Sequence, residues 1–413
     1  MENRNWKRKF IALYTGQFFS LLSSAAVQFS IIWWLTDTTG SPLVLALAGI
    51  AGFLPQALLG PFAGTIVDRH SRKVMMILAD LIVALGSLFL FLWMYYSEPD
   101  ITLVILVLIV RSLATAFHMP AMQASVPLLA PKEHLTMVAG WGQMVSSMTN
   151  IAGPAVGVSL LAVSSLEWVL LFDVFGAIIA CSVLLFIRIP SVTRTEEMAT
   201  DNLIAEMKEG YHAIVKHRLV LKLTIVMIVV AVLFIPVGTY FPLMVRNHFE
   251  KGVVEAGIVE IVFAIGLIVG ASFLGVLGDR FDKVKTMAAG MILMGISLFI
   301  SGLLLPSMFY VFVVMSFLVG LAGPLFSAPF YAFIQAEIEP QLLGRVFSFV
   351  TSLSLLAAPI GLGLAGFFTE LTNVAVFFSA AGLLIVLNAA VTIKVKKEEA
   401  TCNFYYSFNT SLK

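Results

Sequence analysis

Long apolar runs separated by short polar stretches occupy most of the 413-residue chain. A helix needs about 20 mostly apolar residues to cross a bilayer, and twelve such runs can be placed between the charges, prolines and glycine-rich turns. They cover residues 10–36, 42–67, 74–96, 101–120, 136–163, 169–189, 219–245, 254–277, 286–305, 309–335, 346–368 and 374–393. The pattern predicts an all-α membrane protein with twelve transmembrane helices.

The longest polar stretch separates two sets of six runs. We therefore predict an N-terminal six-helix half over residues 1–189, a cytoplasmic linker over 190–218, a C-terminal six-helix half over 219–393 and a cytoplasmic tail over 394–413. Apolar residues recur at helical spacing among the charges of the linker, which favours an amphipathic helix along the membrane surface. A solvated linker without a helix is the alternative.

The distribution of positive charge predicts the orientation in the membrane. Lysine and arginine are retained on the cytoplasmic side of membrane proteins. With both termini placed in the cytoplasm, 22 of the 25 basic residues fall on that side. Only Arg246 and Lys251 fall outside, and Arg111 lies within a span. We therefore expect a multi-pass protein of the bacterial inner membrane with both termini in the cytoplasm.

Composition supports a lipid environment and excludes other classes. Hydrophobic residues make up 60% of the chain and charged residues 12%, against roughly 45–50% and 25% in soluble domains. Membrane lipid is thus the expected partner for most of the surface. The net charge of +1 gives no general attraction to nucleic acid. Two cysteines, Cys181 and Cys402, are too few for a disulfide framework or a zinc site.

Three features of the first half recur in the second half at nearly constant offsets. The matching residues are Gly64 with Gly275, Asp68 with Asp279, Pro120 with Pro329, Pro131 with Pro340, and 152–154 with 357–359, at offsets of 211, 209 and 205. Such order indicates an internal duplication of six spans. Duplicated halves in a membrane protein are typical of transporters that alternate about a central site.

The loop after the second run contains a glycine, an aspartate and three basic residues at defined spacing, Gly64, Asp68, Arg69, Arg72 and Lys73. These residues resemble the loop signature of the major facilitator superfamily, with Ser71 in place of its last glycine. The second half repeats part of it with Gly275, Asp279 and Arg280. The resemblance covers essentially the whole chain and implies the major facilitator fold. It also implies that the loops act as a cytoplasmic latch, although the basic residues can instead serve only to set the topology.

The fifth run resembles the antiporter motif of the same superfamily. Gly140, Gly153, Pro154 and Gly157 match it, while Thr149 and Val158 replace two further glycines. Small residues let helices cross closely, and proline bends a helix. The resemblance implies a drug/proton antiporter and disfavours an uptake symporter. Glycine and proline are also common in membrane helices generally, which is the alternative explanation.

Four charged residues lie more than three residues inside the ends of the runs: Arg111, Asp80, Asp173 and Glu260. Arg111 lies ~15 Å from either end of its run at 1.5 Å per residue, where an arginine costs at least about 2.5–3.5 kcal/mol. It resembles the arginine of the superfamily's fourth-span motif. We expect Asp80 to form a structural pair near Arg111, and Glu260 to be the better candidate for a proton carrier.

Five further stretches resemble the macrolide efflux proteins of this superfamily. They are residues 52–61, 67–70, 79–82, 111–118 and 343–348. The resemblance implies proton-driven efflux of lipophilic drugs, foremost macrolides, with protons as the coupling ion. Cooperation with an ABC-type ATPase is left open. Export of another amphipathic metabolite or a siderophore is the alternative.

Neutral polar residues within the runs are candidates for a substrate cavity, because an amide that faces lipid is costly. Gln28 and Asn150 are favoured by their mid-span depth, and interhelical hydrogen bonding is the alternative role for each. The six histidines are scattered and form no paired ligand motif, and no phosphate-binding loop or nucleophile motif is present. An intramembrane enzyme is therefore disfavoured, and no cofactor is expected.

Overall fold

A computed structural model describes residues 6–131, 134–189, 203–277, 282–339 and 342–411. Within its helices, the side chains of some residues, including Asp68, Arg69 and Gly140, lie outside the description. The described chain is helical, and twelve of its helices are long and apolar enough to cross a membrane. The prediction of an all-α protein with twelve spans is confirmed.

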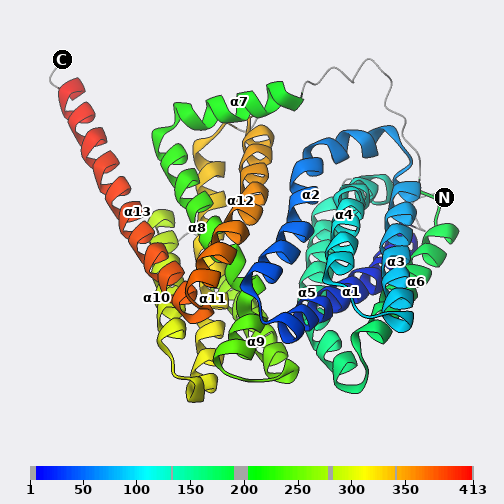
Figure 1. The fold of residues 1–413 in the computed structure, drawn as a ribbon. Coiled ribbons are helices and arrows are strands. Elements are labelled where there is room, and N and C mark those ends of the chain that lie inside the picture. Colours follow the sequence, from blue (N-terminus) through cyan, green and yellow to red (C-terminus); the bar gives the residue numbers. More distant parts are fainter. Residues whose placement is uncertain (1–5, 132–133, 190–202, 278–281, 340–341, 412–413) are drawn as a thin grey trace. The chain divides into compact units, whose positions relative to one another are not determined.

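The chain forms two compact units, of residues 1–200 with 251–261, and of residues 201–250 with 262–413. The first unit contains six helices (Figure 1): α1 (Trp6–Thr39), α2 (Pro42–Arg69), α3 (Arg72–Tyr96), α4 (Ile101–Leu129), α5 (Leu135–Val163) and α6 (Leu166–Phe186). Two of these helices begin after a residue whose side chain caps the helix N-terminus. The Ser41 side chain accepts a hydrogen bond from the Val44 amide before Pro42 begins α2, and Asp100 accepts one from the Thr102 amide at α4.

The second unit begins with the helix of the predicted linker. Its elements are α7 (Leu203–Lys216), α8 (Arg218–Leu243) with a π-helical turn (Met244–His248), α9 (Val253–Leu277), α10 (Lys283–Leu303), a 3₁₀ turn (Pro306–Met308), α11 (Phe309–Glu337), α12 (Leu343–Leu371) and α13 (Val374–Ser411). The first residues of α9, up to Ile261, belong to the first unit. In α7, Ile214 is buried and Lys216 is exposed. Tyr211 of α7 packs against Phe349 of α12, with ring centroids 5.9 Å apart. Residues 203–216 are thus helical, so the alternative of a linker without a helix does not hold for them.

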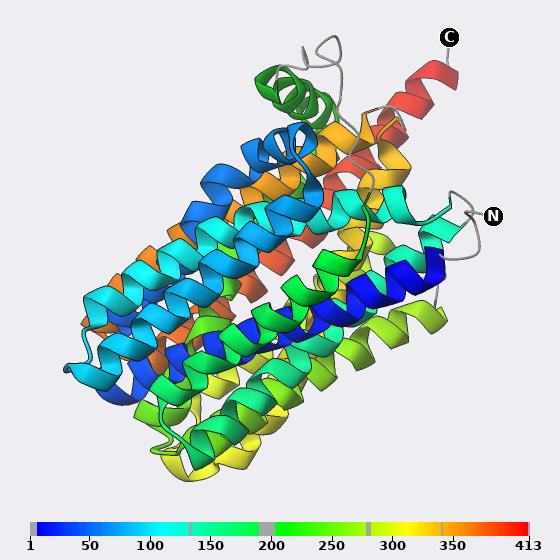
Figure 2. The ribbon, with the colours of Figure 1, turned by 90° about the vertical axis from the view of Figure 1, so that its right-hand side faces the viewer.

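Helices pack in the same order in both units. In the first unit α1 contacts α5 and α6, α3 contacts α4 and α6, and α2 contacts α4. Figure 2 shows α3 and α4 side by side. In the second, α8 contacts α12 and α13, and α10 contacts α11 and α13. The remaining pair, α9 with α11, meets where Gly266 and Gly320 face backbone atoms of Phe317 and Phe263. This correspondence supports the duplication inferred from the sequence offsets.

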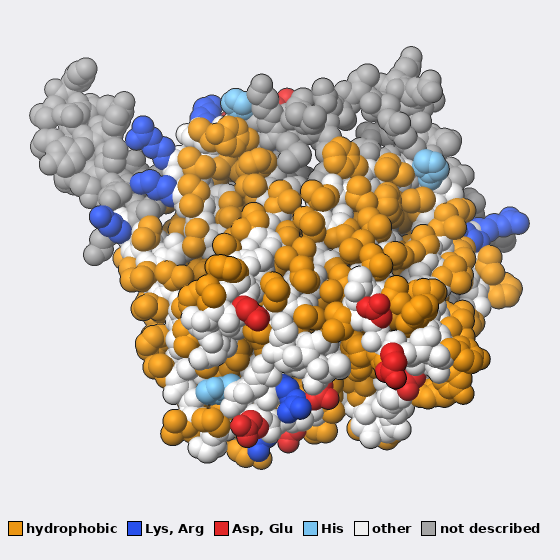
Figure 3. Space-filling model, viewed as in Figure 1, with side chains coloured by type: hydrophobic (Ala, Val, Ile, Leu, Met, Phe, Trp, Pro, Cys, Tyr) orange, Lys and Arg blue, Asp and Glu red, His pale blue; other side chains and the backbone are white. Residues whose placement is uncertain are grey.

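Apolar side chains dominate the surface of the helices. Figure 3 shows few charged side chains on the face it presents. Several large apolar side chains are mostly exposed on the surface of the protein, such as Phe186 at 91%, Tyr310 at 81% and Phe367 at 68%. A surface of this kind is stable in lipid but not in water, so it fits a protein that crosses the membrane many times.

Candidate functional site

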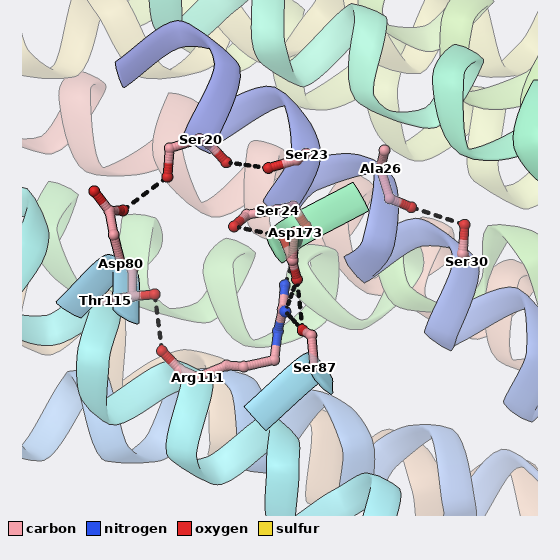
Figure 4. Close-up of polar contacts among 10 residues, drawn as sticks. All are labelled: Ser20, Ser23, Ser24, Ala26, Ser30, Asp80, Ser87, Arg111, Thr115 and Asp173. Atoms are coloured by element: carbon pink, nitrogen blue, oxygen red, sulfur yellow. Dashed lines mark hydrogen bonds and ion pairs between the residues drawn. The ribbon is translucent and has the colours of Figure 1, made fainter. Parts of the chain in front are cut away.

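A buried ion pair lies at the centre of the first unit. Arg111 of α4 forms it with Asp173 of α6, and the two residues are only 6% and 2% exposed. Asp173 also accepts hydrogen bonds from Ser87 of α3 at 2.8 Å and from Ser24 of α1 at 3.1 Å. Figure 4 shows that four helices converge on this pair. We call these four residues the Arg111 layer.

Hydrogen bonds in the Arg111 layer offset the cost of burying two charges. Both oxygens of Asp173 are occupied, one by Ser24 and the other by Ser87 and Arg111. Arg111 also donates to the Ser87 hydroxyl at 2.9 Å and to the backbone carbonyl of Ser24 at 3.3 Å. Additional hydrogen bonds help to offset the desolvation of a buried ion pair, and here they leave only the Nε atom of Arg111 without a partner among the described residues. The layer therefore holds α1, α3, α4 and α6 in one arrangement.

A second polar group lies closer to the Arg72 end of α3. Asp80 accepts a hydrogen bond from Ser20 of α1 at 2.7 Å, and the Nε2 atom of His118 on α4 lies 3.3 Å from the same Asp80 oxygen. Both residues are buried, with 5% and 6% exposure. We call Ser20, Asp80 and His118 the Asp80 layer. The expectation that Asp80 pairs with Arg111 is wrong, because Arg111 pairs with Asp173 and Asp80 faces His118.

Helix periodicity explains why the polar residues form two layers. Arg111 and His118 are seven residues apart on α4, as are Asp80 and Ser87 on α3. Seven residues make about two turns, or ~10 Å, so they share one face of each helix. Because α3 and α4 run in opposite directions along the chain, Asp80 meets His118 while Ser87 meets Arg111.

Other predicted site residues lie apart from these layers. Glu260 lies in α9 and is partly buried, and no ion pair or hydrogen bond joins it to another described residue. Gln28 is partly buried in α1 and Asn150 is exposed on α5. Their role as cavity residues stays a prediction.

The loop motif is described only in part. Lys73 donates to the backbone carbonyls of Leu185 and Ile187 at the end of α6, both at 3.0 Å. Arg72 is buried at the start of α3. Gly64, Asp68 and Arg69 lie in α2 without a description of their surroundings, and Asp279 and Arg280 lie outside the described residues, so the latch stays a prediction. A Cβ added to Gly275 would meet no described atom within 4 Å.

Glycines of the fifth span allow α5 to approach α1 closely. A Cβ at Gly153 would lie 2.5 Å from the Ala25 Cβ, and one at Gly157 would lie 2.8 Å from the Ala26 carbonyl oxygen. Pro154 lies between them inside α5. The structure therefore shows the close crossing expected at Gly153 and Gly157, while the surroundings of Gly140 lie outside the description.

Comparison with known proteins identifies the family. A model of the Major Facilitator Superfamily matches residues 13–259 and 223–402. The chain belongs to the Major Facilitator Superfamily. This superfamily member is 40% identical over 387 residues to Macrolide efflux protein A of Streptococcus pyogenes, and the match covers 94% of this chain and 96% of that protein. The resemblance to macrolide efflux proteins inferred from the sequence is confirmed.

More distant relatives share the fold. Multidrug efflux pump Tap of Mycobacterium tuberculosis is 27% identical over 409 residues, which cover 96% of this chain and 95% of the pump. The crystal structure of a bacterial homologue of the iron transporter ferroportin, in an inward-facing state, matches with a TM-score of 0.72 at 15% identity, over 94% of this chain and 98% of that one. A bacterial homologue of the lysosomal transporter Spinster matches with a TM-score of 0.67 at 16% identity, over 95% of each chain. These structures confirm the major facilitator fold of this superfamily member.

Sequence reasoning missed several residues of both layers. His118 was noted only as one of six scattered histidines, and Ser20, Ser24 and Ser87 were not considered. One signal was available for His118: it lies seven residues from Arg111, on the same face of a helix of this superfamily member. No comparable signal existed for the serines, because serine is common in membrane helices as a packing residue.

Proposed function

We propose that this chain exports lipophilic drugs, foremost macrolide antibiotics, across the bacterial cell membrane in exchange for protons. The observation that carries the proposal is the 40% identity to Macrolide efflux protein A, which extends over nearly the whole of both chains. The 27% identity to a multidrug efflux pump supports drug export in general. Both termini lie in the cytoplasm in this proposal, because that orientation retains most basic residues on the inner side.

Alternating access is the mechanism that best fits the repeated architecture. Two units with the same order of helix packing can move as bodies about a site at the membrane midplane. Each unit has a well-packed interior, so the motion requires little change inside a unit. In the first unit the Arg111 layer supplies part of this rigidity through its hydrogen bonds.

Buried acids support protons as the coupling ion. Asp80 and Asp173 are buried in membrane helices, and Glu260 is partly buried in another. Ionisable residues at such depth are costly and commonly mark ion pathways in transporters. The membrane potential contributes about 2.3 kcal/mol per charge at 100 mV, which is sufficient to drive export when protons enter.

Collapse of the proton gradient is expected to stop drug efflux. Cells that express the chain should extrude labelled erythromycin, and an uncoupler should reduce the initial rate to that of cells without the chain, because no driving force remains. ATP must be kept at its normal level so that only the gradient changes. Efflux at the full rate in uncoupled, ATP-replete cells would instead indicate an ATPase partner.

Glu260→Gln is expected to separate drug movement from the pH gradient. Glutamine keeps the shape of a protonated carboxyl group but cannot release a proton, so drug exchange at equal pH should continue while stimulation by a pH gradient is lost. Both rates can be measured with purified protein in liposomes. Glu255→Gln is a suitable control, because Glu255 lies on the same helix in its first turn. If Glu260→Gln retains full stimulation by the gradient, Glu260 does not carry the exchanged proton.

A further inference from the structure

The two polar layers of the first unit differ in how completely their groups are satisfied. In the Arg111 layer both Asp173 oxygens have partners, and only the Nε atom of Arg111 has none among the described residues. In the Asp80 layer, Asp80 Oδ2 has no hydrogen-bond partner among the described residues. His118 Nε2 lies near Asp80 Oδ1 without hydrogen-bond geometry. A buried polar group without a partner is costly and calls for an explanation.

A third orphaned side chain lies beside the Asp80 layer. Gln17 of α1 is fully buried, and neither its Oε1 nor its Nε2 has a hydrogen-bond partner in the described part of the chain. It lies three residues before Ser20, on the same face of α1. Several buried hydrogen-bond donors and acceptors near Asp80 therefore have no partner among the described residues.

The residue types make only one of the two layers able to exchange a proton. Arginine stays protonated in proteins, and Asp173 is held by three donors, so the Arg111 layer keeps a fixed charge state. Histidine is the side chain that changes charge near neutral pH. A histidine and a carboxylate 3.3 Å apart can hold one proton between them, on either group, without a change in the helix packing.

The charged surroundings of His118 are few. From α3 it faces Asp80, and Arg72 lies two turns away on that helix. The Sγ atom of Cys181 on α6 lies 4.0 Å from the carbonyl oxygen of Ile77, one turn before Asp80 on α3. On α1 the titratable residues before Ser20 are Tyr14 and, further away, Lys7, Arg8 and Lys9. The charged residues of α2, Asp68 and Arg69, lie at its end, and their side chains are not described. Among the described groups Asp80 is thus the carboxylate that His118 meets.

We propose that Asp80 and His118 together form a proton-binding site in the first unit, and that it takes up a proton in addition to any held by Glu260. The proposal rests on the proton exchange of the proposed function. When the pair is protonated, the extra proton occupies one of the orphaned positions between the two side chains, and Ser20 continues to hold Asp80 in place through its 2.7 Å hydrogen bond. When the pair releases the proton, Asp80 Oδ2 and His118 Nε2 are again without hydrogen-bond partners among the described residues.

His118→Gln tests the proposal in liposomes. A pH gradient with the acid side outside should stimulate erythromycin efflux by the wild type about tenfold and by the variant less than about twofold, because glutamine does not titrate near neutral pH. Drug exchange at equal pH should remain measurable, since it needs no net proton movement. His248→Gln is the control, because His248 contacts the Leu304 carbonyl at 2.7 Å. Full stimulation in His118→Gln would overturn the proposal.

A second measurement covers the case in which His118→Gln does not fold. In a chain whose other histidines (His70, His134, His212, His217 and His248) are replaced by glutamine, the ring nitrogen signals of ¹⁵N-labelled His118 should change across a series of pH values, because the pair takes up a proton. In Asp80→Asn the pH dependence of these signals should differ from that of the otherwise identical chain, because the carboxylate of the pair is gone. Constant signals over the whole range would overturn the proposal. Wild-type protein that moves no drug while His118 still titrates would refute only the proposed function.

Discussion

Arg111→Ala is expected to abolish transport and to destabilise the protein by about 3–5 kcal/mol, the usual cost of leaving a buried charge without its partner. Asp173 is 2% exposed, and it would keep only the hydrogen bonds from Ser24 and Ser87. Asp173→Asn should be similarly destabilising, because it leaves the guanidinium of Arg111 in the same interior. Thermal unfolding in detergent and erythromycin efflux in liposomes measure the two effects.

The double variant Arg111→Gln with Asp173→Asn distinguishes stability from function. It removes both charges and should recover most of the stability, since a neutral pair leaves no buried charge. Transport should remain lost, because the positive charge near the midplane is gone. A matched control is Arg345→Ala, which breaks an exposed ion pair with Glu209 and should cost no more than about 1 kcal/mol. Wild-type transport by the double variant would show that the pair serves only stability.

Gly157→Leu is expected to disrupt the first unit and to stop transport. A Cβ at this position would lie 2.8 Å from the Ala26 carbonyl oxygen and 3.0 Å from Phe29 Cδ1. A backbone atom cannot yield as a flexible side chain does, so α1 must move away from α5. Overpacking of this kind costs about 1–3 kcal/mol or more. Because α1 also carries Ser20 and Ser24, the displacement would loosen both polar layers.

Gly60→Leu is the control for this prediction, since a Cβ at Gly60 meets no described atom within 4 Å. Its unfolding temperature and efflux rate should match those of the wild type, whereas Gly157→Leu should lower both. Gly157→Ala provides a graded test, because even one methyl group enters the same space. Normal unfolding and transport by Gly157→Leu would mean that the crossing of α1 and α5 can widen without consequence.

The number of spans could be predicted from the sequence because lipid imposes a strict rule. Backbone groups in the membrane must be hydrogen-bonded within the segment, so an apolar run of sufficient length becomes a helix. The same rule does not predict where a span ends. The first helix begins at Trp6 and the last continues to Ser411, beyond the apolar runs, because polar residues at helix ends are no longer constrained by lipid.

The partner of Arg111 could not be predicted in the same way. Two carboxylates lie within the predicted spans of the first half, Asp80 and Asp173, and Asp80 was expected near Arg111. Which carboxylate pairs with Arg111 depends on how α3 and α6 are rotated about their axes. In a soluble protein the polar face of a helix indicates this rotation, but a helix in lipid has no such polar outer face. The structure places Ser87 rather than Asp80 on the level of Arg111, and Asp173 completes the layer from α6.

The two repeats share an order of helix packing but differ in the charged residues of one pair of corresponding helices, α4 and α11. At the 209-residue offset that relates α4 to α11, Arg111 corresponds to Gly320 and His118 to Ser327. Gly320 lies against the backbone of Phe263, so the place of a fixed charge in one repeat is taken by direct helix contact in the other. At these two positions the repeats therefore share helix packing but not charge. A protein built from two copies of the second repeat would keep the helix arrangement but have no ionisable group at these two positions.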